Sequence, residues 1–151
     1  HILCTHGHYD HVGSAGVLSR EWGAKVWCEP ADCGGTQLFP LKGADFGYEE
    51  GGSFTVDELT FTVWHTPGHT EGSVVLLCDT YLFVGDTVFQ GSIGRTDLEG
   101  GSSRKMDESL RKFDALPIPK ETQLLPGHGD FSTYGEELKN NFYIRNALRN
   151  A

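Results

Sequence analysis

The chain has 151 residues, of which 38% are hydrophobic and 22% charged, and 12 Lys and Arg against 21 Asp and Glu give a formal net charge of -9. This length and composition predict one folded domain spanning residues 1–151 and argue against a disordered chain. The acidic balance argues against a nucleic-acid partner. No apolar run approaches the roughly 20 residues of a membrane-spanning helix, so we expect no membrane partner.

The four cysteines, at positions 4, 28, 33 and 78, form no CxxC pair. This spacing favours four reduced thiols over a disulfide framework. The first residues show no pattern of a secretory signal peptide. We therefore expect a cytoplasmic protein.

The first third of the chain predicts a strand, a helix and a second strand. The apolar residues 2–5 predict a buried strand, 12–22 a helix that ends at Gly23, and 25–28 another strand. This order is typical of a parallel βαβ unit. The Gly-rich stretch 31–51 has weak periodicity, so we expect it to be mostly loop.

Two hairpins are predicted in the middle of the chain. Their strands are expected at 53–56, 59–65, 73–78 and 81–84, and each pair flanks two turn residues that begin with Asp.

The last third predicts two helices and one short strand. Apolar residues at helical spacing predict a helix up to Leu116 that begins after the cap candidates Ser102 and Ser103. A short strand is expected at 122–125. The capping-box pattern at 133–136 then predicts one terminal helix. The whole chain therefore predicts a mixed α/β fold.

Imidazole and carboxylate side chains recur where predicted strands end in Gly-marked turns. Side chains released from several strand ends can converge on one point at the edge of a sheet. Five His and two Asp are too many ligands for one tetrahedral ion, but they suit two ions that share a carboxylate and keep positions open for water. These ligand types suit zinc, iron or manganese. The candidates are His6, His8, Asp10, His11, His69, Asp86 and His128.

The run His6-Gly7-His8-Tyr9-Asp10-His11 resembles the HxHxDH hallmark of the metallo-β-lactamase fold superfamily. Within that superfamily the chain looks most similar to the glyoxalase II-like hydrolases, also called hydroxyacylglutathione hydrolase-like. Further matching strings follow in the family's order, namely Thr66-Pro67-Gly68-His69-Thr70, Gly85-Asp86-Thr87, the stretch 91–98 and Pro126-Gly127-His128-Gly129.

For the fold, the resemblance implies an αβ/βα sandwich of two mixed sheets with outer helices and the site at one edge. Family members usually begin with several additional strands, whereas this chain starts at the strand just before HxHxDH. We therefore expect an incomplete first sheet. A homodimer, or strand complementation by another chain, would complete it. The helical domain with which glyoxalase II binds glutathione is also expected to be absent.

For the site, the resemblance implies two divalent metal ions, with Zn²⁺ as the first expectation and Fe or Mn as alternatives. It assigns His6, His8 and His69 to one ion, Asp10, His11 and His128 to the other, and Asp86 to both.

The activity that the resemblance implies is hydrolysis of a small-molecule thioester or related activated ester, with a glutathione thioester among the candidates. The nucleophile would be a hydroxide that bridges the two metal ions. Asp10 and Asp86 would orient this hydroxide. Arg95 is a candidate for contact with an anionic substrate.

Two alternatives stay open. Persulfide dioxygenases of the same superfamily also resemble the chain, including its Gly-Arg-Thr-Asp loop at 94–97. They hold one iron, here on His6, His69 and Asp86. The chain could also be a non-catalytic metal-binding fragment, or a subunit that needs complementation.

Overall fold

The computed structural model describes all residues from His1 to Ala151, and a six-stranded mixed sheet forms its centre. The strand order is β10-β9-β6-β5-β4-β3. The strands are β3 (Ser53–Val56), β4 (Leu59–His65), β5 (Val74–Cys78), β6 (Tyr81–Gly85), β9 (Gln123–Pro126) and β10 (Ser132–Thr133). The strands β3 to β6 pair antiparallel in chain order, whereas β9 pairs parallel with β6. Because β9 is parallel to β6, both strands end at the same edge of the sheet.

Both predicted hairpins are confirmed. The register pairs Val56 with Leu59 and Cys78 with Tyr81, so each turn has two residues between the paired positions. Asp57 and Asp79 begin these turns with φ of 52° and 56°. Short hairpin turns favour Asp, Asn or Gly at such positions, because these residues tolerate the left-handed conformation best.

The first sheet is small. It consists of β1 (Ile2–Leu3) and β2 (Val26–Trp27), which pair parallel as the predicted βαβ unit requires. The helix expected over 12–22 is α2 (Ala15–Trp22), and Gly23 ends it in the left-handed conformation, as predicted. A separate turn of helix, α1 (Tyr9–Val12), precedes it. The prediction therefore missed α1, which carries two of the candidate ligands.

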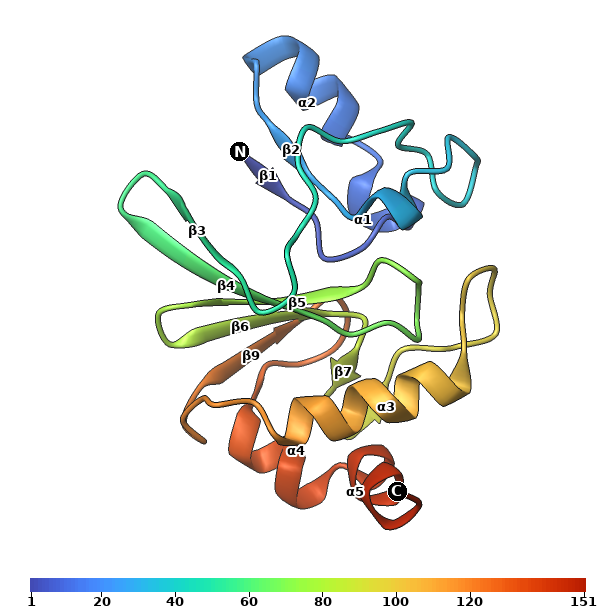
Figure 1. Cartoon of the computed structure of the whole chain (residues 1–151), viewed down its shortest axis with the longest axis vertical. Helices are drawn as coiled ribbons and strands as arrows, with labels where there is room; N and C mark the ends of the chain where they lie inside the picture. The colour runs from blue at the N-terminus through green and yellow to red at the C-terminus, as the bar shows by residue number, and fades with distance from the viewer.

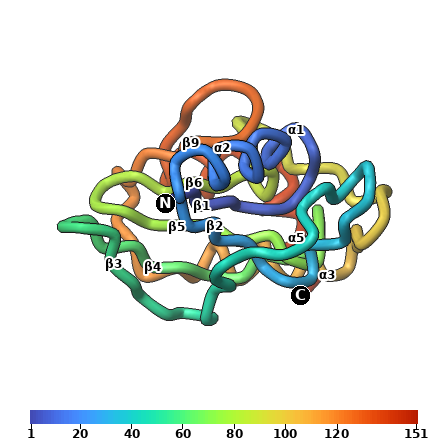
Figure 2. Tube along the Cα trace, turned by 90° about the horizontal axis from the view of Figure 1, so that it is seen from above, coloured from blue at the N-terminus to red at the C-terminus, as the bar shows by residue number.

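The elements form layers (Figure 1). The helices α3 (Ser103–Asp114), α4 (Tyr134–Asn140) and α5 (Phe142–Arg149) cover one face of the central sheet. The β1–α2–β2 unit lies on the opposite face, and the view from above places it over the middle of the sheet (Figure 2). This arrangement and the small first sheet agree with the predicted sandwich. None of the helices has the length and apolar character that a bilayer crossing requires.

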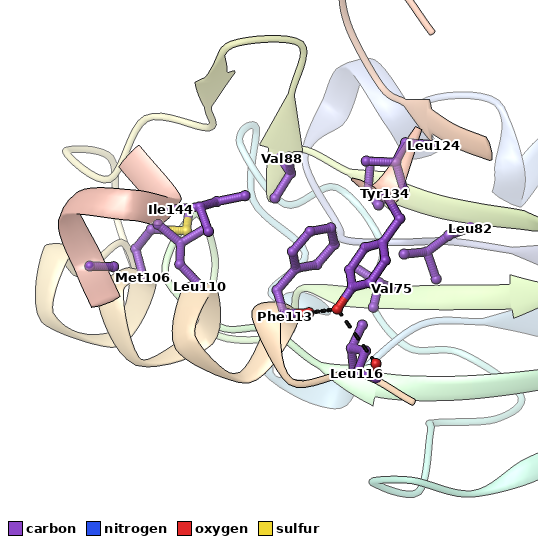
Figure 3. Close-up of a cluster of buried hydrophobic side chains, with 12 residues drawn as sticks. Val75, Leu82, Val88, Met106, Leu110, Phe113, Leu116, Leu124, Tyr134 and Ile144 are labelled. Atoms are coloured by element: carbon purple, nitrogen blue, oxygen red, sulfur yellow. Dashed lines mark hydrogen bonds between the residues drawn. The ribbon is translucent and has the colours of Figure 1, made fainter. Parts of the chain in front are cut away.

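The larger core lies between the central sheet and the C-terminal helices (Figure 3). Phe113 of α3 is fully buried there and meets the Tyr134 ring edge-on, with the ring centroids 5.1 Å apart. The single proton of the Tyr134 hydroxyl is shared between the Phe113 carbonyl at 2.6 Å and the Asp114 carbonyl at 2.9 Å. Tyr134 therefore satisfies carbonyl groups at the C-terminal end of α3, which the helix itself leaves unpaired.

The expectation of one terminal helix is wrong, because Asn141 separates α4 from α5. Asn141 is fully buried, has the extended conformation, and caps α5 by accepting hydrogen bonds from the backbone N–H groups of Tyr143 and Ile144. Its Nδ2 donates to the carbonyl of Ser92 at 2.9 Å. Ser92 belongs to a two-strand hairpin of β7 (Val88–Phe89) and β8 (Ser92–Ile93), which the sequence did not predict.

Candidate metal centre

Four loops bring the predicted ligands together at one edge of the central sheet. These loops follow β1, β4, β6 and β9, on the side opposite the two hairpin turns (Figure 1). Three groups of three side chains have ligand atoms that all lie within 4.8 Å of one another. Together the groups include every residue that the sequence predicted as a ligand: His6 with His8 and His69, His6 with His11 and Asp86, and Asp10 with His11 and His128.

Asp86 lies at the centre of this cluster and is 7% exposed. Its Oδ2 lies 3.2 Å from Nε2 of His69 and 3.4 Å from Nε2 of His128. Its Oδ1 lies 3.3 Å from Nε2 of His11. One carboxylate thus contacts imidazoles from three different loops.

The site has a buried side and an open side. His6, His8 and His69 are each at most 4% exposed, whereas Asp10 is 40% and His128 is 55% exposed. A substrate can therefore reach the group that contains Asp10 and His128.

The donor atoms of the cluster fit a bound metal. Buried polar atoms in folded proteins nearly always have a hydrogen-bond partner, and leaving one without costs about 1–3 kcal/mol. In the whole chain only four buried side-chain nitrogen or oxygen atoms lack one, and all four are in this cluster: Nε2 of His6, His8 and His11, and Oδ1 of Asp86. Coordination of metal ions would satisfy these atoms.

The charges of the site also suit cations. Burial lowers the pKa of His6 to about 2, so His6 stays neutral and keeps a free nitrogen lone pair. Burial opposes ionisation of Asp86, but the neighbouring His11 and His69 outweigh this effect and hold its pKa below the usual range. Asp86 is therefore a carboxylate beside the neutral imidazole of His6, and carboxylate and imidazole together are a favourable donor set for a divalent ion.

The Arg95 carbonyl orients His69. Nδ1 of His69 donates a hydrogen bond of 2.7 Å to this carbonyl oxygen. Because a carbonyl can only accept, Nδ1 carries a proton, and this contact fixes the ring so that Nε2 faces Asp86. The loop 94–97 thus contacts the site through its main chain.

Asp32 supports the cluster and was not predicted from the sequence. It lies in a 3₁₀ turn (Pro30–Asp32), is 1% exposed, and was expected only as part of a loop. Its Oδ2 accepts hydrogen bonds from Gly7 N at 2.9 Å and Thr70 Oγ1 at 2.7 Å, and its Oδ1 accepts one from Gly72 N at 2.8 Å. Asp32 therefore connects the loop of His6 and His8 to the loop of His69. An Asp in a Gly-rich stretch gives no local signal for such a role.

Position 127 has space only for glycine, because two candidate ligands lie close to its Cα. A Cβ at this position would lie 2.4 Å from Oδ1 of Asp86 and 2.6 Å from Cε1 of His11. Any larger residue would push these two candidate ligands apart. Packing against Asp86 and His11 therefore explains the first glycine of the Pro-Gly-His-Gly string.

A pocket of about 440 Å³ opens above the cluster. Its floor includes His8, Asp10 and His128. Arg95 also lines the pocket, but its guanidinium is exposed and donates two hydrogen bonds to Asp97, at 2.7 and 2.8 Å. The structure therefore places Arg95 in the pocket lining with its guanidinium in an ion pair.

Residues 1–128 match the model of the metallo-beta-lactamase superfamily. The chain belongs to this superfamily. The predicted family and fold are thereby confirmed, and the chain is a superfamily metallo-hydrolase with His and Asp candidates for its metal site.

Named relatives agree with this assignment. The hydroxyacylglutathione hydrolase GloC of Haemophilus influenzae is 31% identical over 159 residues, which cover 95% of this chain and 74% of the relative. The crystal structure of the BLEG-1 B3 metallo-beta-lactamase superposes with a TM-score of 0.83 at 33% identity, over 95% of this chain and 76% of that one. TTHA1623, crystallised in a di-iron-bound form, gives a TM-score of 0.79 at 32% identity, over 94% of this chain and 76% of that one.

Proposed function

We propose that the chain hydrolyses thioesters or related activated esters with the help of two divalent metal ions. The observation that carries this proposal is the position of the Asp86 carboxylate, 3.2 to 3.7 Å from imidazole nitrogens of four different histidines. His6 and His69 belong to the candidate group on the buried side, and His11 and His128 belong to the group with Asp10 on the open side. A carboxylate between two such groups is suited to bridge two ions.

The proposed ligand sets follow these groups. Zn²⁺ is the first candidate, with Fe and Mn as alternatives, because imidazole and carboxylate accept all three. When bound, two such ions supply a hydroxide at neutral pH and polarise a substrate carbonyl. We assign His6, His8 and His69 to one ion, Asp10, His11 and His128 to the other, and Asp86 to both.

Asp10 and Asp86 are the proposed catalytic residues. Each carboxylate offers about four lone-pair sites, so it could hold metal ions and still accept a hydrogen bond from the attacking water. Both side chains line the pocket. Holding the water in one orientation beside the carbonyl carbon lowers the entropic part of the barrier.

A small-molecule thioester is the proposed substrate, and the name of the Haemophilus relative puts glutathione thioesters among the candidates. Glutathione carries carboxylates. We propose that Arg95 contacts one of them, since Arg95 is among the residues that line the pocket. Asp97 would compete for the same guanidinium.

Metal content and thioester hydrolysis test the proposal together. Protein purified without added metal is expected to contain about two ions per chain and to hydrolyse S-lactoylglutathione or a simpler thioester. Asp86→Ala is expected to lose activity by about 10²-fold or more and to retain fewer ions. Asp107→Ala is the matched control, because Asp107 is a partly buried aspartate on α3, outside the cluster.

Two results would contradict the proposal. Near-normal hydrolysis by Asp86→Ala would refute the bridging role of Asp86. One iron per chain, with oxygen consumption on glutathione persulfide and no thioester hydrolysis, would instead favour the dioxygenase alternative.

A further inference from the structure

The pocket above the metal cluster has an apolar wall that the proposed hydrolysis does not use. Its side chains come from separate segments: Leu38 from the loop after the 3₁₀ turn, Phe89 and Ile93 from the β7–β8 hairpin, and Leu98 from the following loop. All four are partly exposed. They leave apolar surface in water directly beside polar ligands.

This wall is held in place by buried polar contacts. Glu137 and Asn141, both at most 2% exposed, are the two anchors. Glu137 Oε1 accepts a hydrogen bond of 2.8 Å from the backbone N–H of Gly91, in the hairpin turn. Nδ2 of Asn141 donates to the carbonyls of Phe89 and Ser92 at 3.2 and 2.9 Å. The hairpin is therefore tied to α4 and the start of α5, and Phe89 is presented in a preformed position.

Leu38 is supported by a main-chain contact of its own. The backbone N–H of Tyr9 donates a hydrogen bond of 3.0 Å to the carbonyl of Leu38. Because Tyr9 begins α1, which carries Asp10 and His11, Leu38 is linked to the metal cluster itself. The apolar side chains and the metal candidates thus keep a fixed relation to each other.

We infer that this wall binds the acyl group of the substrate and makes the chain selective for thioesters of short apolar acids. The inference rests on the proposed function and names its substrate class. Apolar surface is removed from water favourably only by an apolar group. The thiol part of glutathione thioesters is charged, and charged groups are costly to place against apolar walls. The acyl chain is therefore the part of the substrate that fits beside Leu38, Phe89 and Leu98.

A series of thioesters with one neutral thiol tests this selectivity. The metal-loaded chain is assayed with acetyl, butanoyl, hexanoyl and lactoyl esters of N-acetylcysteamine. We expect kcat/KM to rise by up to about fourfold per added methylene, which corresponds to burial of one methylene group. We also expect the hexanoyl ester to exceed the lactoyl ester, because the lactoyl hydroxyl finds no polar partner on this wall.

Two serine variants test whether the apolar wall causes the dependence of kcat/KM on acyl length. Leu38→Ser and Leu98→Ser are expected to flatten the dependence on chain length while the metal content stays unchanged. Leu59→Ser is the matched control, because Leu59 is 48% exposed on β4, outside the lining of this pocket. The control is expected to keep the full dependence.

The outcomes separate the two proposals. Measurable hydrolysis with no dependence on acyl length, or a preference for the lactoyl ester, overturns the inference and leaves the hydrolase function intact. Failure to hydrolyse any thioester overturns both. Calorimetry adds a readout without turnover: hexanoate is expected to bind the metal-loaded chain more tightly than acetate, with a negative heat-capacity change. Equal affinity for the two acids would also overturn the inference.

Discussion

Thr70 Oγ1 donates a hydrogen bond of 2.7 Å to the carboxylate of Asp32, and the two residues are 38 positions apart in the chain. Both are buried, with Thr70 at 0% and Asp32 at 1% exposure. Thr70 directly follows His69, and the same carboxylate accepts from the backbone N–H of Gly7, between His6 and His8. One carboxylate therefore joins the two loops that carry the three histidines proposed for one ion.

Asp32→Asn tests this arrangement. Asn has the same shape but only one acceptor oxygen, so at least one of the three donors loses its partner. We expect metal affinity to fall by about 10- to 100-fold, as for other changes behind a ligand. We also expect the unfolding free energy to fall by about 1–3 kcal/mol. Metal titration and denaturant unfolding measure the two effects.

Asp45→Asn is the matched control, because Asp45 also accepts a backbone hydrogen bond, from Val26 N at 2.8 Å, but is exposed and outside the cluster. It is expected to leave metal affinity unchanged. Equal metal affinities in the two variants would refute the positioning role of Asp32.

Gly127→Ala is expected to remove at least one ion per chain, because the new methyl group would lie between Asp86 and His11. Elemental analysis of the purified variant checks this. Gly43→Ala is the control, since a Cβ there has no neighbour within 4 Å and neither glycine has a positive φ. Two ions in both variants would show that the site can move to accommodate the methyl group.

Arg95→Ala is expected to retain its metal, because His69 is bonded to the main-chain carbonyl of Arg95 and not to its side chain. If the guanidinium contacts an anionic substrate, KM for a glutathione thioester rises while KM for a neutral thioester stays constant. Arg104→Ala, which removes an exposed arginine of α3, is the control. A loss of metal in Arg95→Ala would show that the side chain supports the loop.

Tyr134→Phe is expected to lower the unfolding free energy by about 1–2 kcal/mol, because two carbonyls at the end of α3 lose their donor. Burial raises the pKa of Tyr134 to about 12, whereas a free tyrosine ionises near pH 10. Between these values the unfolded chain loses its proton first, so the stability that this hydroxyl contributes declines as pH rises. Denaturant unfolding at pH 9 and pH 11 should therefore show a smaller gap between wild type and variant at pH 11. A constant gap would contradict the raised pKa.

Much of the candidate site could be predicted because each proposed ligand lies in a short string with its own local signal. His6, His69, Asp86 and His128 each follow a strand and adjoin a glycine. Such signals involve only residues close in sequence, so no contact between distant segments is needed to find them. The two hairpins were predictable for the same reason, since alternation and a two-residue turn are local.

Other features depend on contacts that no local pattern reports. The capping-box pattern predicts one helix through α4 and α5, but Asn141 interrupts it, and its buried amide bonds to the β7–β8 hairpin. The hairpin itself has strands of two residues, too short to show a period.

The sequence by itself determined the ligand types, their order along the chain and the strand ends that release them, because periodicity, turn residues and motif strings are all short-range. Only the tertiary structure decided how these ligands meet. The parallel pairing of β6 with β9 brings Asp86 and His128 to one edge, and the Asp32 carboxylate joins the loops on the buried side. Both depend on residues some 25 to 42 positions apart, whose proximity follows from packing the whole sheet.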